Sequence, residues 1–75
     1  MPDGMVGATG EVTVAIPVDG AGEVYVGRGP ARETYIARAD EELAVGTRVL
    51  VVEELGDRAL TVVRWNALHD GGGRI

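Results

Sequence analysis

The chain has 75 residues with neither cysteine nor serine, and 12 acidic residues against 7 arginines give it a formal net charge of −5. This length allows one small domain, and the missing residue types exclude disulfides, thiolate sites and serine or cysteine triads within the chain. The negative charge disfavours nucleic acids and anionic lipid surfaces as partners, because both are bound mainly through basic side chains. The sequence has no apolar run near the roughly 18–20 residues of a transmembrane helix and no signal-peptide pattern.

The N-terminal half predicts a leader and three strands. Residues 1–6 show no hydrophobic period, and we expect a flexible leader there. Residues 11–16 alternate apolar and polar side chains, which predicts a half-buried strand. Glycine-rich turns separate it from a short second strand at 23–27 and from a third strand at 32–39.

The C-terminal half predicts a hairpin and a tail. Residues 40–45 are too few for a stable helix, so we expect an irregular connection anchored by Leu43 or Val45. Two β-branched runs at 46–55 and 58–65 flank Gly-Asp, which is a typical two-residue hairpin turn. The polar, glycine-rich residues 66–75 predict a disordered tail. Five short strands in one small domain predict an all-β barrel, since closure removes unpaired edges.

A two-residue turn at 56–57 fixes the register of this hairpin. It pairs Glu53 with Leu60, Val52 with Thr61 and Val51 with Val62. One face of the hairpin must then line the barrel interior with the apolar face of the first two strands. The residues expected to point inward are Val12, Val14, Ile16, Val24, Val26, Val49, Val51, Leu60 and Val62.

The opposite face of the hairpin is also apolar. Leu50, Val52, Val63 and Trp65 form an outward stripe, with Arg48 placed to stack on the tryptophan. Either the leader or tail covers this stripe, or it binds a partner, because tryptophan is enriched at binding hot spots. The candidate partner-binding residues are therefore Arg48, Leu50, Val52, Val63 and Trp65.

No residue pattern indicates a catalytic, cofactor or metal site. His69 lies in the predicted tail without the rigid support that catalysis requires. Glu53 and Glu54 are neighbours on a strand and point to opposite faces, so they cannot chelate one ion together. The acidic run at 40–42 is typical of a solvated turn. The glycines at 20–22 lack both a complete dinucleotide motif and a following helix.

Three segments together resemble the C-terminal soluble domain of the NfeD-like proteins, including the shorter YuaF-like members. The segments are residues 7–17 with 20–24, residues 35–39, and residues 46–53 with 60–62. The resemblance implies a five-stranded OB-fold over residues 7–65, with no catalytic residues. It also implies a parent protein in which transmembrane helices precede this domain, and partners of the stomatin and flotillin type. The serine-protease domain of longer members has no counterpart in this sequence.

Function is therefore expected to be non-catalytic protein interaction at a membrane, with the domain on the cytoplasmic face and no nucleic acid as partner. The alternative is an OB-fold protein that binds nucleic acid, which rests on fold analogy alone. A third possibility is an enzyme fragment that uses Glu53 or Glu54 with carboxylates from a partner chain.

Overall fold

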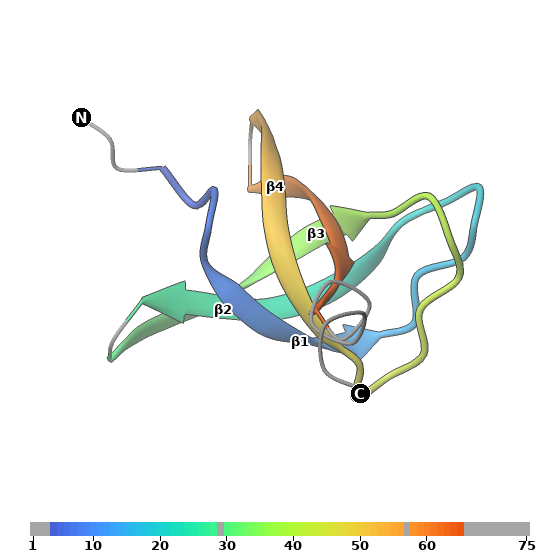
Figure 1. The fold of residues 1–75 in the computed structure, drawn as a ribbon, viewed down its shortest axis with the longest axis horizontal. Coiled ribbons are helices and arrows are strands. Elements are labelled where there is room, and N and C mark those ends of the chain that lie inside the picture. The colour runs from blue at the N-terminus through green and yellow to red at the C-terminus, as the bar shows by residue number, and fades with distance from the viewer. Residues whose placement is uncertain (1–3, 29, 57, 66–75) are drawn as a thin grey trace, which may run out of the picture.

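The computed structural model describes residues 4–28, 30–56 and 58–65. The strands are β1 (Thr9–Val14), β2 (Gly22–Arg28), β3 (Ala31–Arg38), β4 (Arg48–Gly56) and β5 (Ala59–Arg64). They close into a barrel in the order β1-β2-β3-β5-β4, in which β1 lies between β2 and β4 (Figure 1). The predicted all-β, five-stranded barrel is confirmed, whereas the predicted tail lies outside the described residues. Within the described part of the chain, no helix has the length and hydropathy needed to cross a membrane.

Small aliphatic side chains fill the barrel. The alternation along β4 and β5 places one face inside, as predicted, and each buried valine or leucine contributes about 1.5–3 kcal/mol relative to exposure. Tyr35 and Ala39 pack against this core from β3 and the loop that follows it. The buried side chains among the described residues are Ala8, Val12, Ile16, Val24, Val26, Ala37, Leu43, Val49, Val51, Leu60 and Val62.

The expected inward position of Val14 is wrong. Its side chain is 48% exposed, because the β1–β2 pairing shifts by one residue between Val12 and Val14. Val12 pairs with Val24, but Val14 pairs with Glu23. A bulge of this kind inserts one residue, so Val14 no longer shares the inward face of Val12. The strand consequently ends at Val14, two residues before the predicted end.

The turn of the β4–β5 hairpin also differs from the prediction. Gly56 pairs with Ala59, so the turn lies between these two residues rather than between Leu55 and Arg58. Two register shifts, after Val51 and after Glu54, move the pairing by two residues between the barrel and the turn. Glu54 rather than Glu53 therefore faces Leu60. Arg58 in the turn has a positive φ angle of 61°, which is typical of tight hairpin turns, and Gly56 beside the second register shift has a φ of 92°.

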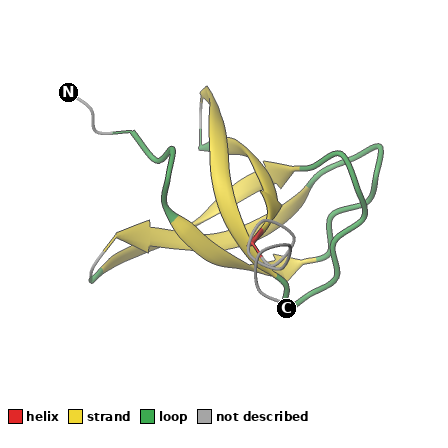
Figure 2. Ribbon diagram, in the orientation of Figure 1, coloured by secondary structure: helices red, strands yellow, loops and turns green. Residues whose placement is uncertain are grey.

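The loops at 15–21 and 39–47 extend from the same end of the barrel (Figure 2). Ile16 and Leu43 join them through two main-chain hydrogen bonds, each 2.9 Å between nitrogen and oxygen. Both side chains are buried, so the prediction that Leu43 or Val45 anchors this connection is confirmed for Leu43. A 2.6 Å ion pair between Glu41 and Arg64 further ties the second loop to β5.

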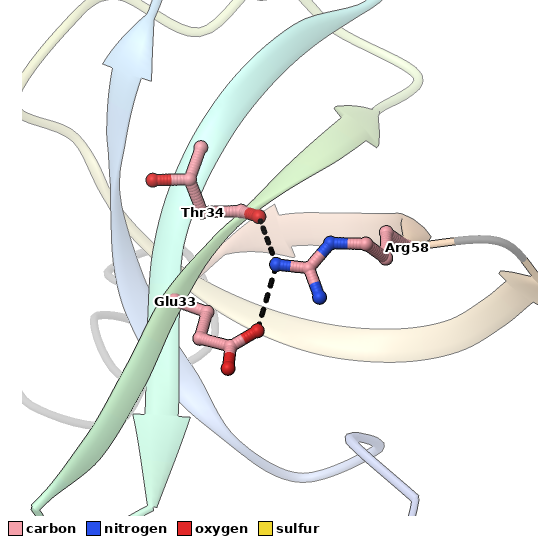
Figure 3. A network of polar contacts seen from close by, with 3 residues as sticks. All are labelled: Glu33, Thr34 and Arg58. Atoms are coloured by element: carbon pink, nitrogen blue, oxygen red, sulfur yellow. Dashed lines mark hydrogen bonds and ion pairs between the residues drawn. The ribbon is translucent and has the colours of Figure 1, made fainter.

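Arg58 bridges β5 to β3 at the opposite end of β5. Its guanidinium lies 2.7 Å from the Glu33 carboxylate and donates a 3.3 Å hydrogen bond to the Thr34 carbonyl oxygen (Figure 3). The same group lies 5.0 Å from the centre of the Tyr35 ring. The Arg58 carbonyl accepts a hydrogen bond from the amide of Ile36. These contacts hold the parallel β3–β5 pair, which has three residue pairs.

Candidate functional site

The middle of the predicted outward stripe is assembled by the β4–β5 hairpin. Leu50 pairs directly with Val63, and both side chains are half-buried on the outer face of the barrel. Leu50 stands between the core valines Val49 and Val51, and Val63 follows the core valine Val62, so the alternation of a strand turns both side chains outward. Leu50 also pairs with Thr9 of β1. The apolar surface therefore lies on adjacent strands at the β1–β4 junction.

The other stripe residues lie around this pair. Arg48 is exposed two residues before Leu50 on the same face. Val52 is 42% exposed and stands at the first bulge, so Glu53 rather than Val52 pairs with Thr61. Trp65 follows the end of β5 and is half-buried. Among the described residues, Arg32 stacks on the ring of Tyr25 and Arg58 on the ring of Tyr35.

The barrel also brings together a polar groove that sequence reasoning missed. Its volume is about 370 Å³, and it lies over β1 between an arginine of β3 and an arginine of β4. Its residues come from β1, from β3, and from β4 with the loop before it, so no single local motif contains them. The only signal in the sequence is Arg48, which was predicted for its place beside the stripe. The groove is lined by Thr9, Gly10, Glu11, Arg32, Gly46 and Arg48.

Strand register explains why these side chains share one surface. Directly opposed residues in a sheet project from the same face. Glu11 is opposite both Tyr25 and Arg48, which places these three residues in one row across β2, β1 and β4. Thr9 begins the neighbouring row, with Leu50 on one side and Gly27 on the other. Gly27 is in turn opposite Arg32. The polar groove and the apolar stripe thus meet at the pair of Thr9 and Leu50.

Metal-binding chemistry has no counterpart in the described part of the chain. No three histidine, aspartate or glutamate side chains there lie close enough together to hold an ion. Glu53 and Glu54 are both exposed on β4, and the carboxylate of Glu54 accepts a hydrogen bond from the amide of Met5. The acidic run at 40–42 lies in the loop before β4, where Glu41 is paired with Arg64. His69 lies outside the described residues.

Comparison with known proteins places this barrel in a family. The sequence model of the NfeD C-terminal domain matches residues 9–63. The solution structure of the soluble domain of the NfeD protein YuaF from Bacillus subtilis is 33% identical in sequence, with a TM-score of 0.69. The similarity covers 79% of this chain and 71% of that chain. A search of curated proteins gives no match. The chain belongs to the NfeD C-terminal domain family.

Proposed function

We propose that this domain is a non-catalytic protein-interaction module of an NfeD-like membrane protein. Its partner is a stomatin- or flotillin-type scaffold protein, and the two act together in membrane organisation. Family membership supports the membrane-anchored parent, since the related YuaF structure is described as a soluble domain of its protein. In this proposal the domain faces the cytoplasm, where it meets the soluble part of the scaffold protein.

The observation that carries the proposal is the outer apolar stripe, defined as Leu50, Val52, Val63 and Trp65. Leu50 and Val63 are paired on the outer face, so the barrel interior does not use their exposed area. Val52 adds a side chain that is 42% exposed. Burying this remaining apolar area under a partner is favourable by roughly 25 cal/mol per Å². A half-buried tryptophan at the end of such a surface is the residue type most enriched among binding hot spots.

Binding to the scaffold protein is tested by titration of the ¹⁵N-labelled chain with the soluble domain of a stomatin-type protein. We expect chemical-shift changes at the Trp65 indole and at the amides of Leu50 and Val63. The exposed residue Val52 is the site of the variant, because Val52→Glu adds charge to the stripe without emptying the core. A loss of affinity of about tenfold is expected, as for a charge placed in an apolar interface.

The matched control is Val14→Glu, because Val14 is an equally exposed strand valine that lies outside the stripe. It should bind as the unsubstituted chain does. Unchanged signals at the Trp65 indole with saturating scaffold domain would refute the stripe as the binding surface. Equal losses of affinity in Val52→Glu and Val14→Glu would instead indicate a general effect of added negative charge.

A further inference from the structure

The arginines of the polar groove have donors that the barrel does not use. Within the described residues, the resolved arginine–carboxylate ion pairs are Arg58–Glu33 and Arg64–Glu41, and neither lies in the groove. Arg48 is exposed and has no partner among the described residues. A free guanidinium has five N–H donors in a planar fork that matches a carboxylate. The groove therefore offers positively charged N–H donors that can bind an anion.

Arg32 is held at the groove without being neutralised. Its guanidinium carbon lies 5.8 Å from the centre of the Tyr25 ring. Such stacking occupies the face of the guanidinium and leaves its in-plane N–H groups free for a second partner. Tyr25 belongs to the same outer face as Glu11 and Arg48. The ring thus orients one arginine beside β1 while Arg48 approaches from β4.

The charge and size of the groove restrict what it can hold. Two arginines and Glu11 give a formal charge of 2 − 1 = +1, which suits one negative charge better than several. Its volume of about 370 Å³ lies at the small end of the roughly 300–1,000 Å³ range of ligand pockets. The rest of the surface is acidic, with a net charge of −5 for the chain, and repels long polyanions. A single carboxylate satisfies these restrictions.

We infer that this groove binds the carboxylate of an aspartate or glutamate in an extended segment of the partner protein. Arg32 and Arg48 donate to the carboxylate oxygens, and the Thr9 hydroxyl lies beside them in the groove. Because Thr9 is paired with Leu50, an apolar side chain two residues along the segment, on the same face as the carboxylate, reaches the outer apolar stripe. This inference rests on the proposed function, since it specifies the chemistry of the surface that the same module recognises.

The test uses a capped pentapeptide, Leu-Thr-Glu-Thr-Leu, whose glutamate and leucines share one face when it is extended, and a matched peptide in which glutamine replaces the glutamate. The ¹⁵N-labelled chain is titrated with each at low salt. The glutamate peptide should shift the amides of Thr9, Gly10 and Gly46, and the glutamine peptide should not. Arg48→Gln should weaken binding about fivefold or more, as expected when a charge-assisted contact is removed.

Two further variants serve as matched tests. Arg38→Gln removes another exposed arginine, on β3 outside the groove, and it should leave the affinity unchanged. Glu11→Gln removes the negative charge from the groove and should tighten binding about twofold or more. Equal weakening by Arg38→Gln and Arg48→Gln would overturn the inference, because the effect would then come from net charge.

Other occupants of the groove give distinct results. Shifts at the same amides with an oligothymidylate, at concentrations below those needed for the peptide, would overturn the carboxylate assignment. Concentration-dependent shifts without any peptide would overturn it too, because a second copy of the chain would then supply the anion. A scaffold domain that binds the unsubstituted chain and Arg48→Gln equally would refute the groove and leave the proposed function standing. Binding of the glutamate peptide without binding of the scaffold domain would support the groove and refute the proposed function.

Discussion

Arg58 offers a direct test of how the parallel β3–β5 junction is held. In Arg58→Ala, the stacking on Tyr35 and the ion pair with Glu33 are lost together. Stacking at an exposed site contributes about 0.5–1 kcal/mol. The ion pair contributes about 0.2–1 kcal/mol, since its side chains are 60% and 56% exposed. The expected loss in the free energy of unfolding is therefore about 0.7–2 kcal/mol.

The backbone of Arg58 supplies the matched control. Its φ of 61° places an L-residue in the left-handed region, at a cost of roughly 1 kcal/mol that glycine does not incur. Arg58→Ala keeps this cost and loses the contacts, whereas Arg58→Gly loses the contacts and relieves the cost. We therefore expect Arg58→Gly to be more stable than Arg58→Ala by about 1 kcal/mol.

Urea denaturation and thermal melts followed by circular dichroism measure both effects. In a domain of this size, 1 kcal/mol corresponds to about 4–8 °C in Tm. A double-mutant cycle with Glu33→Gln separates the ion pair from the stacking, because only the ion pair depends on the carboxylate charge. The reasoning is refuted if Arg58→Ala unfolds at the same urea concentration as the unsubstituted chain. It is also refuted if the glycine variant is the less stable of the two.

Two further substitutions test the barrel interior and the loop anchor. Gly10→Ala should destabilise the fold by about 1–3 kcal/mol, because an added Cβ would lie 2.6 Å from a Val26 methyl carbon and 2.3 Å from the Tyr25 carbonyl oxygen; an unchanged urea midpoint would contradict this. Leu43→Ala should cost about 2–5 kcal/mol in the same assay, since the side chain is 1% exposed. Val45→Ala, at a position 64% exposed, should change stability by no more than about 0.5 kcal/mol, and similar losses in the two would count against Leu43 as the anchor.

The alternation of apolar and polar residues was enough to predict the strands and most of the side chains inside the barrel. Val49, Val51 and Val62 point inward as expected, because a regular strand alternates faces and each of these segments is regular within the barrel. The predictions of face and pairing fail where a bulge interrupts the regular strand. Val14 lies beyond a bulge in β1, and Glu53 lies beyond a bulge in β4. Both bulges arise from pairing with other strands, so they leave no mark in the apolar pattern of the strand itself.

The candidate site was harder to predict than the fold for a related reason. Leu50 and Val63 belong to one hairpin, and their pairing follows from two neighbouring segments of sequence. The groove depends instead on β1 lying between β2 and β4, which is a property of the closed barrel. Arg32 and Arg48 are sixteen positions apart and reach the same groove from opposite sides of β1. Composition and local spacing contain no information of that kind.

The pairing of β1 with β4 closes the barrel, and the same junction carries the residues at which the groove meets the outer apolar stripe. The β1–β4 junction is held by main-chain hydrogen bonds, which continue on both sides of its three residue pairs: the amide of Val51 donates to the Ala8 carbonyl, and that of Val12 to the Thr47 carbonyl. Main-chain bonds do not depend on the side chains that face outward. Thr9 and Leu50 can therefore be selected for what they bind without weakening closure. A small barrel whose interior is fully used by its core has room for recognition on such an outer face.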